Sequence, residues 1–185
     1  MHEPQGFCLF DTAIGACGIA WAEEALVAVQ LPETSDDRTR ARMLRALPDA
    51  PELPEVDPPA WVADVIGRVQ ALLRGERDDL LDVPLDVERV PAFHRRVYEI
   101  TRAIPPGRVL TYGEVARRIG EPGASRAVGA ALGANPFAPV VPCHRVLAAG
   151  GRSGGFSAEG GADTKLRMLE IERAQFGDTP GLFDG

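Results

Sequence analysis

The sequence has few cysteines and almost no lysine. Among its 185 residues are three cysteines and a single lysine, Lys165. An odd number of cysteines without short-range spacing does not form a disulfide framework, and it fits a reducing compartment. The chain also lacks a charged N-terminal segment followed by an apolar one, and it lacks an apolar run of the ~20 residues that a membrane helix needs. We therefore expect a cytosolic protein, or a nuclear one if its host has a nucleus.

The scarcity of cysteine also bears on metal binding. Cys8 and Cys17 lie in an alternating N-terminal stretch, where a small buried hydrophobic residue is the simpler interpretation. Together with His2 they could supply zinc ligands, but there is no C-x-x-C pair and no paired histidine spacing. We predict no metal and no cofactor.

Charge is ordinary in amount and uneven in position. The formal net charge is -7. Residues 1–88 carry a balance of -11, residues 89–173 a balance of +6, and residues 174–185 a balance of -2. A basic second half beside an acidic first half indicates a polyanionic partner for one half only. On charge alone, a solvated basic surface explains the pattern equally well.

The first half, residues 1–88, predicts an α+β arrangement. Short β-prone runs separated by glycine over residues 6–31 predict two or three antiparallel strands. The charged segment 33–60 predicts a short helix followed by proline-rich coil, and residues 61–74 show a helical apolar stripe that ends at Gly75. Residues 80–88 favour one more strand. Nothing in this half converges on a chemical site.

The second half predicts helices with clear end signals. An amphipathic helix is expected over 92–104. Thr111 stands three residues before Glu114, the spacing of a capping box. Gly120 closes that helix, and Ser125 is placed to cap the next one. Two short helices joined by a tight turn form a helix-turn-helix pattern.

The second helix of this pair has an unusually bare surface. Apart from Arg126 it offers only small residues, which are Ala127, Gly129, Ala130, Gly133 and Ala134. Its glycines lower helix propensity, so they indicate close approach either to another helix or to a nucleic-acid groove. A reader of the major groove usually carries several long polar side chains. One arginine on a bare helix suits the minor groove, where a single side chain can wedge into the base stack.

The stretch "PVVPCHRVLAAGG" places Cys143 beside His144 and Arg145. Neighbouring positive groups favour the thiolate, which is the form that attacks carbon or binds a metal. A cysteine next to a histidine is nevertheless more often incidental, because adjacent residues of an extended segment point to opposite faces. From these neighbours alone Cys143 is a buried structural thiol, a metal ligand or a nucleophile.

A carboxylate on the last helix offers a partner for the histidine. Lys165, Met168, Leu169 and Glu172 share one helix face, so Glu172 belongs to an apolar stripe. A carboxylate there is costly unless it is paired. A carboxylate that orients His144, which in turn activates a nucleophile, is a generalised catalytic triad. The alternative is a Glu172 side chain that reaches solvent at the helix edge.

Five motifs in fixed order resemble the O6-alkylguanine-DNA alkyltransferase family over about residues 90–173. They are "TYGEVA", "RAVGAALGANP", "PCHRV", "GGFSAEGG" and K-x-x-M-L-x-x-E. The resemblance implies a ribonuclease-H-like α/β domain at 1–88, a mostly helical domain with a winged-helix-like helix-turn-helix at 89–178, and a flexible tail at 179–185. It also implies a monomeric, cytoplasmic protein, associated with the nucleoid if bacterial, whose partner is double-stranded DNA containing O6-alkylguanine.

The resemblance further implies a methylated-DNA-protein-cysteine S-methyltransferase that acts once. Cys143 would accept the alkyl group, and His144, held by Glu172, would take the thiol proton through a bound water. Tyr112 would hydrogen-bond the flipped guanine at N3 and crowd its phosphate, while Arg126 would fill the space that the base leaves. Extrusion of the base is needed because the alkyl carbon lies inside the duplex stack.

The remaining implied roles concern support and recognition. Asn135 would be a hinge between the recognition helix and the turn that bears the cysteine. The carbonyl groups of Cys143 and Val146 would read the guanine amino group, Lys165 would help hold the site together, and the segment 153–161 would form a lid. The other implied contacts are Ser157 as a donor to guanine O6, Arg145 among the substrate-binding residues, and Ala127, Gly129 and Ala130 among the DNA-binding residues.

Three other functions remain open. The first is a lesion-binding protein that flips alkylguanine without transfer, and the presence of Cys143 argues against it. The second is a transcription regulator, which the single long side chain on the second helix disfavours. The third is a thiol hydrolase.

Overall fold

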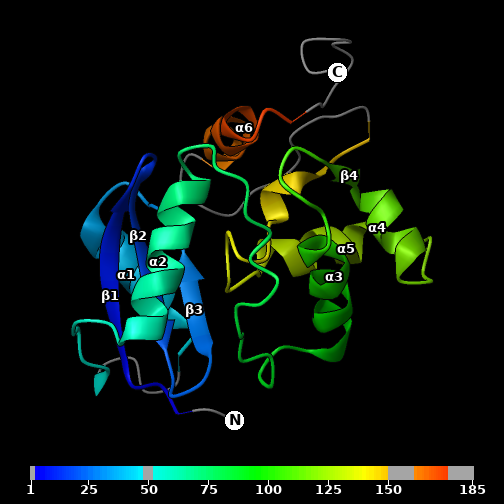
Figure 1. The fold of residues 1–185 in the computed structure, drawn as a ribbon. Coiled ribbons are helices and arrows are strands. Elements are labelled where there is room, and N and C mark those ends of the chain that lie inside the picture. Colours follow the sequence, from blue (N-terminus) through cyan, green and yellow to red (C-terminus); the bar gives the residue numbers. More distant parts are fainter. Residues whose placement is uncertain (1–2, 48–51, 150–160, 175–185) are drawn as a thin grey trace.

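The first half of the molecule is a three-stranded antiparallel sheet with a helix on each face (Figure 1). The computed structural model describes residues 3–47, 52–149 and 161–174. The strands are β1 (Gly6–Thr12), β2 (Gly15–Trp21) and β3 (Leu26–Gln30), in the order β1-β2-β3. The helices are α1 (Asp36–Arg45) and α2 (Ala60–Leu72). The strands expected over residues 6–31 and both helices expected for this half are confirmed.

Alternation along β2 supplies both faces of the sheet. Cys17 and Ile19 point into the core that α2 shares, whereas Ala20 packs with Met43 of α1 on the other face. This is the period-2 pattern of a strand that is buried on both sides. Small residues face α1, so that helix approaches the sheet closely.

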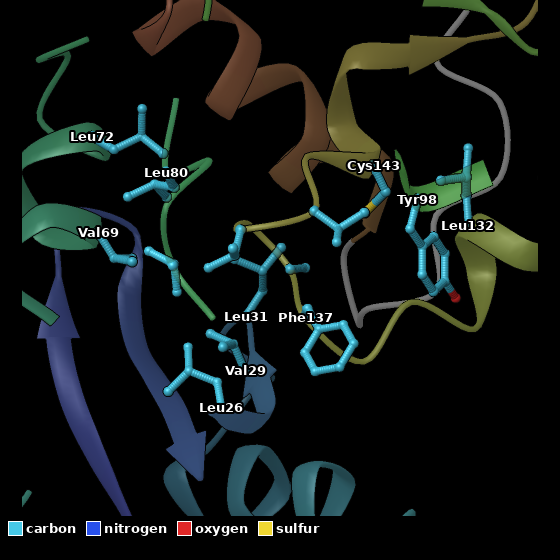
Figure 2. Packing of buried hydrophobic residues seen from close by; sticks show 14 of the residues in the cluster. Leu26, Val29, Leu31, Val69, Leu72, Leu80, Tyr98, Leu132, Phe137 and Cys143 are labelled. Atoms are coloured by element: carbon cyan, nitrogen blue, oxygen red, sulfur yellow. The ribbon is translucent and has the colours of Figure 1, made fainter. Parts of the chain in front are cut away.

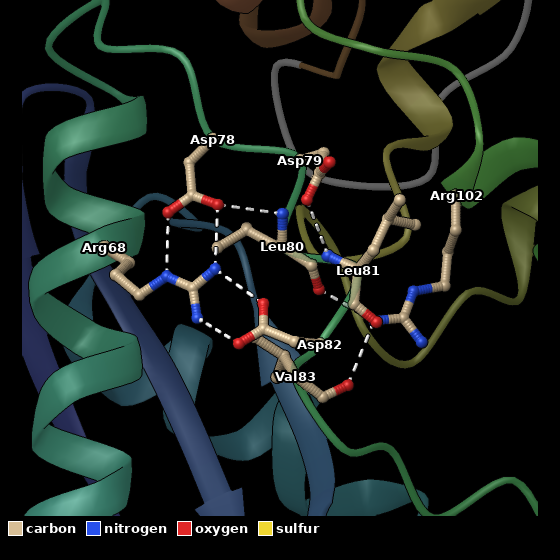
Figure 3. A network of polar contacts seen from close by, with 8 residues as sticks. All are labelled: Arg68, Asp78, Asp79, Leu80, Leu81, Asp82, Val83 and Arg102. Atoms are coloured by element: carbon tan, nitrogen blue, oxygen red, sulfur yellow. Dashed lines mark hydrogen bonds and ion pairs between the residues drawn. The ribbon is translucent and has the colours of Figure 1, made fainter.

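The strand expected over residues 80–88 is wrong. The segment forms only an isolated bridge between Leu85 and Leu26, and the rest is a loop. Arg68 of α2 holds this loop, since its guanidinium group donates to both Asp78 and Asp82 at 2.7 to 3.0 Å (Figure 3). Side-chain hydrogen bonds from Arg68 lower the pKa of both carboxyl groups. The alternation of apolar residues predicted a strand. The segment is instead ordered by ion pairs and not by a ladder of backbone hydrogen bonds.

The same loop is tied to the second half by Arg102. Its guanidinium group donates to the carbonyl oxygens of Leu80, at 2.8 Å, and Val83, at 3.0 Å (Figure 3). The side chain of Leu80 is itself buried in the core. The loop therefore joins the two halves through backbone acceptors and one apolar anchor.

The second half is built mainly of short helices. Its elements are α3 (Ala92–Arg102), β4 (Leu110–Thr111), α4 (Tyr112–Arg118), α5 (Ser125–Gly133), a 3-10 turn η2 (Cys143–Arg145), β5 (Val146–Leu147) and α6 (Gly161–Ile171). β4 and β5 pair in parallel beside α4. Among the described residues, no helix is long and apolar enough to cross a membrane.

The ends of α4 and α5 follow the sequence signals only in part. The Thr111 hydroxyl accepts a hydrogen bond from the Glu114 backbone N–H at 3.1 Å, as expected for a cap. Gly120 ends α4 in a left-handed conformation, with φ of 81°. Ser125 is a correction: it is the first helical residue, Ala124 precedes it, and no side chain caps α5.

One hydrophobic core runs from the sheet into the second half (Figure 2). Val29 of β3 donates its backbone N–H to the Pro136 carbonyl at 2.8 Å and forms a bridge with Phe137. Arg167 of α6 reaches the Ala13 carbonyl in the first half at 2.8 Å. These contacts fix the segment 134–147, which carries the cysteine, against the sheet.

Candidate active site

The turn that carries Cys143 is held at both ends. Proline residues precede it, its first backbone N–H donates to the Val141 carbonyl at 2.8 Å, and Val146 continues directly into β5. Cys143 is 5% exposed, and His144 and Arg145 are each 1% exposed. All three side chains therefore sit inside the protein, where burial strengthens every electrostatic contact they make.

Asn135 connects the end of α5 to this turn. Its side-chain nitrogen donates to the Val141 carbonyl at 2.8 Å, and its side-chain oxygen accepts from the Phe137 backbone N–H at 2.9 Å. The same side chain hydrogen-bonds the Cys143 thiol. One amide group thus fixes the loop after the helix and contacts the sulfur.

Glu172 lies between His144 and Arg145. Its Oε1 is 2.7 Å from His144 Nε2, and its two oxygens accept from Arg145 Nη2, at 2.7 Å, and Nε, at 2.9 Å. Burial alone would raise the pKa of Glu172, but the His144 and Arg145 contacts outweigh it and hold that pKa to about 2. The expected contact between His144 and Glu172 is present, and the carboxylate is ionised.

His144 is held as a neutral base. Burial lowers its pKa, with the Glu172 carboxylate acting in the opposite direction. Because Nε2 faces the carboxylate, this nitrogen carries the ring proton and Nδ1 keeps its lone pair. Nδ1 is buried and has no hydrogen-bond partner among the described residues. The imidazole therefore has one acceptor available for a proton.

The three thiols have different surroundings. Burial raises the pKa of Cys17 to about 12, and burial together with Glu55 and Asp57 raises that of Cys8 to about 11. Burial raises the pKa of Cys143 as well, but the Asn135 hydrogen bond, the positive charge of Lys165 and backbone hydrogen bonds all counteract it. Cys143 is the thiol with groups arranged to stabilise a thiolate.

Lys165 of α6 connects the thiol to Tyr112. Its Nζ donates to the Tyr112 hydroxyl at 3.3 Å and lies 5.6 Å from the centre of that ring. Burial lowers the pKa of Lys165 to about 8, and the Cys143 thiolate acts in the opposite direction. Tyr112, the first residue of α4, lies next to Gly129 of α5, where an added Cβ would be 3.9 Å from the ring.

The outer face of α5 is bare, as the sequence predicts. Val128, Ala131 and Leu132 are buried against the core, whereas Arg126, Ala127 and Ala130 are exposed. The Tyr98 hydroxyl of α3 donates to the Ala131 carbonyl at 2.7 Å and holds the buried side of the helix. Because the side chains on the exposed side are small, another molecule can come close to the backbone of α5.

The surroundings of Arg145 differ from the sequence-based expectation. Arg145 is enclosed by Glu172 and by the Ile104 carbonyl, which accepts from its Nη1 at 2.8 Å, so its guanidinium does not face an open substrate surface. The pairing of Arg145 with Glu172 was not predicted from the sequence. A buried, ionised carboxylate needs more than one partner, and this requirement could have indicated it. Ser157 lies outside the described residues.

The site is built from protein groups of both signs rather than from a cluster of metal ligands. Among the residues that the structure describes, no three histidine, cysteine, aspartate or glutamate side chains come together to hold a metal ion. Instead, Asn135 and Lys165 act on the Cys143 thiol, Lys165 contacts Tyr112, and the adjacent His144 is paired with Glu172. Such a set can accept an electrophilic carbon at sulfur and a proton at nitrogen.

Comparisons with known proteins match this site and the fold around it. A family model described as 6-O-methylguanine DNA methyltransferase, DNA binding domain, matches residues 92–174. A methylated-DNA-protein-cysteine methyltransferase of Mycolicibacterium paratuberculosis is 43% identical over 126 residues, 68% of this chain and 74% of that protein. A DNA base-flipping protein of Thermus thermophilus is 47% identical over 106 residues, 57% of this chain and 69% of that protein.

The likeness extends to the three-dimensional structure. The crystal structure of Mycobacterium tuberculosis OGT in complex with DNA has a TM-score of 0.71 at 34% identity, and the match covers 94% of this chain and 96% of that one. Both halves of the molecule are therefore matched, not only the residues around Cys143. The chain belongs to the O6-methylguanine-DNA methyltransferase family.

Proposed function

We propose that this protein repairs DNA directly, by flipping an O6-alkylated guanine out of the duplex and transferring the alkyl group irreversibly to Cys143. The observation that carries the proposal is the buried thiol of Cys143, held by Asn135 beside the charge of Lys165, next to an imidazole whose Nε2 is held by Glu172. The relatives named for methylated-DNA-protein-cysteine methyltransferase activity support the same reaction.

In the proposed reaction His144 acts as the base and Cys143 as the nucleophile. The thiol proton passes to His144 Nδ1 through a bound water, and the Glu172 carboxylate balances the charge of the resulting imidazolium. The sulfur then bonds to the alkyl carbon as the bond between that carbon and O6 breaks. The electron pair stays with the guanine, which takes up a proton to become the normal base. The thioether has no easy leaving group, so the protein acts once.

The bare face of α5 is the proposed DNA-binding surface. Arg126 enters the base stack and replaces the flipped guanine, while Ala127, Gly129 and Ala130 allow the helix to approach the minor groove. Flipping costs a few kcal/mol, and less for an alkylated guanine because it pairs poorly. The net charge of +6 over residues 89–173 favours this half as the one that meets the phosphates.

The residues around the thiol recognise and hold the extruded base. Tyr112 hydrogen-bonds guanine N3 and crowds the phosphate of the target nucleotide. The carbonyl groups of Cys143 and Val146 read the guanine amino group, and Ser157 donates to O6. Lys165 keeps Tyr112 and the sulfur in one arrangement, which its contact with the tyrosine hydroxyl supports.

Arg145 and Asn135 have supporting roles in this proposal. Arg145 keeps Glu172 ionised and oriented toward His144 instead of touching substrate, which its two hydrogen bonds to the carboxylate support. Asn135 acts as the hinge between α5 and the turn that bears Cys143, in line with its bond to the Val141 carbonyl.

We also assign the finer domain description as a proposal. Residues 1–88 form a ribonuclease-H-like domain, supported by the antiparallel sheet between two helices. Residues 89–178 form the DNA-binding and alkyltransferase domain, whose small β4–β5 sheet beside α4 and α5 supports a winged-helix-like arrangement. The tail at 179–185 lies outside the described residues. In this proposal the protein works as a monomer in the cytoplasm, associated with the nucleoid if the host is bacterial.

A second candidate function is lesion binding without transfer, which the 47% identity to a DNA base-flipping protein favours. The thiol distinguishes the two functions, because binding alone needs no nucleophile and no base beside it. Cys143 with its activating neighbours makes transfer the better conclusion.

The test is a reaction between the protein and a duplex that contains one O6-methylguanine. We expect guanine to be restored in an amount equal to the protein present, followed by no further reaction when more duplex is added. Restoration in excess of the protein would contradict the single-turnover proposal. Tight binding of the duplex with no restored guanine would favour lesion binding instead.

A further inference from the structure

A cavity of about 570 Å³ lies between the two halves, apart from the alkyl-acceptor site. Its wall is formed by β3, the end of α1, the connector before α3, α3 itself, and residues 133–137 after α5. Cys143, Tyr112 and Arg126 do not line it. Its volume is within the range of about 300 to 1,000 Å³ that is typical of small-molecule sites.

Arg89 provides an unusual polar group in this wall. Its Nε and Nη1 atoms are buried and have no hydrogen-bond partner among the described residues. A buried donor without an acceptor is costly, and the cost is larger for a charged group. Arg68 and Arg145 show the usual solution in this chain, since both have carboxylate partners. Arg89 instead has two N–H groups beside a cavity with no acceptor in the part of the chain that the structure describes.

The charged side chains around the cavity favour an anion. Arg45 lines it together with Arg89 and with Arg42, whose Nη1 is already paired with the Glu33 carboxylate at 2.9 Å, and the carboxylate in the lining is that of Asp86. One oxygen of Asp86 already accepts from the Glu88 backbone N–H at 3.1 Å. The guanidinium fork of an arginine matches a carboxylate or phosphate group with two parallel hydrogen bonds.

The remainder of the wall is apolar and aromatic. Its side chains include Val27, Val29, Met43, Leu47, Val90 and Tyr98. His94 lies edge-on to the Tyr98 ring, with ring centres 6.0 Å apart. A free inorganic anion would leave these surfaces in contact with water, whereas an anion with an apolar body would cover them.

We propose that this cavity binds a small organic anion whose carboxylate or phosphate head is held by Arg89 and whose apolar or aromatic body fills the space between β3 and α3. Cys143 does not line this cavity, so the site is separate from the alkyl acceptor itself. Asn135 lies in its wall as well as beside the thiol, so an occupant contacts the hinge from the other direction.

The test uses the full chain and a fluorescent organic anion, 8-anilinonaphthalene-1-sulfonate, titrated in the absence of DNA. We expect one site per chain. Arg89→Gln should weaken binding about tenfold, the effect of losing one charge-assisted contact. Ala46→Trp should weaken binding of the probe by a similar factor. Ala46 lines the cavity, so an indole ring there would occupy its space, and it is exposed, so the substitution should not disturb the fold. Arg74→Gln, an exposed arginine elsewhere, should bind like the wild type.

Competition then identifies the head group. Octanoate and phenyl phosphate should displace the probe, and displacement by only one of them assigns the head to that class. Octanol, which has the same body without a charge, and inorganic phosphate, which has no body, should displace it poorly. The proposal is overturned if octanol competes as well as octanoate, or if no probe binds. It is equally overturned if Arg89→Gln and Ala46→Trp both bind the probe like the wild type, since the probe then sits elsewhere.

Discussion

The two halves of this protein bury different kinds of side chain. In the described part of the first half, the buried polar side chains are those of Thr39, Asp86 and Glu33, the last paired with Arg42, and its surface is acidic. The second half buries four ionisable groups around the cysteine turn: His144, Arg145, Lys165 and Glu172. Burying charge costs several kcal/mol per ion before pairing. The first half therefore contributes mainly apolar packing, while the second gives up some stability to hold ionisable groups beside the thiol.

The cysteines of the two halves show the same contrast in the groups that surround their sulfur atoms. Cys17 and Cys143 belong to one hydrophobic core and are both buried. Cys17 has only the Thr12 hydroxyl beside its sulfur, whereas Cys143 has an amide donor and a cation. Burial alone makes a thiol inert, so the neighbours decide which cysteine reacts.

The strongest test of this comparison removes the Cys143 thiol and the Cys17 thiol in separate variants. Cys143→Ala should abolish alkyl transfer completely and leave DNA affinity intact, because the sulfur is the acceptor and lies behind the DNA-binding face. Cys17→Ala should transfer at the wild-type rate and lose about 1 kcal/mol of stability through the small cavity. Guanine restoration and duplex binding measure the two properties. Equal loss of both in Cys143→Ala would mean that this thiol is structural as well.

The next largest effect is expected at Glu172. Glu172→Gln removes the charge that balances Arg145 and orients His144, so we expect the free energy of unfolding to fall by about 3 kcal/mol and the transfer rate to fall about 100-fold or more. Denaturant unfolding and single-turnover kinetics measure these changes. Glu170→Gln, at an exposed position of α6 two residues before Glu172, is the matched control and should change neither.

The same variant should alter the response to acid. The pKa of Glu172 is lowered from 4.5 to about 2, so its contribution to stability is present above pH 4.5 and is lost as the pH falls toward 2. Glu172→Gln should lack this part of the acid unfolding profile. A wild-type profile that is flat between these values would contradict the ionised state of the buried carboxylate.

The charged form of Lys165 lowers stability, unlike the charged form of Glu172, and this effect should be visible in alkali. Its pKa is lowered from 10.5 to about 8, so the folded protein loses this proton before the unfolded chain does. The burial cost is therefore present below pH 8 and is relieved as the pH rises toward 10.5, by about 3 kcal/mol at most. Unfolding at pH 7 and pH 10 should show that Lys165→Met lacks this gain relative to the wild type. Lys165→Arg, which keeps its proton, should lack it too.

The smallest expected effect separates the outer face of α5 from the buried network. Arg126→Ala should slow repair of O6-methylguanine in duplex DNA about 10- to 100-fold, because only a paired base must be flipped. Reaction with free O6-benzylguanine should stay at the wild-type rate. Parallel losses with the two substrates would show that Arg126 supports the site itself rather than base extrusion.

The sequence predicts those features that depend on local patterns. The Thr111 cap follows from its spacing to Glu114, and the bare face of α5 follows from helical periodicity around Arg126. The contact between His144 and Glu172 was predictable because a carboxylate on an apolar stripe requires a partner.

Features that depend on distant contacts were not predictable. The apolar alternation of residues 80–88 resembled a strand, yet Arg68 and Arg102 order that segment as a loop. The family resemblance implied that Arg145 binds substrate. Only the docking of α6 turns its guanidinium group toward Glu172. Such contacts link residues far apart in the chain, and no periodicity records them.

The most direct test of the contrast between the halves is to locate the transferred group among the three thiols. The protein is incubated with duplex DNA that carries O6-methylguanine with a deuterated methyl group, digested, and analysed by mass spectrometry. We predict one labelled methyl per chain on the peptide that contains Cys143, with the Cys8 and Cys17 peptides unlabelled. A label on either first-half cysteine, or no label on Cys143 while guanine is restored, would contradict the account.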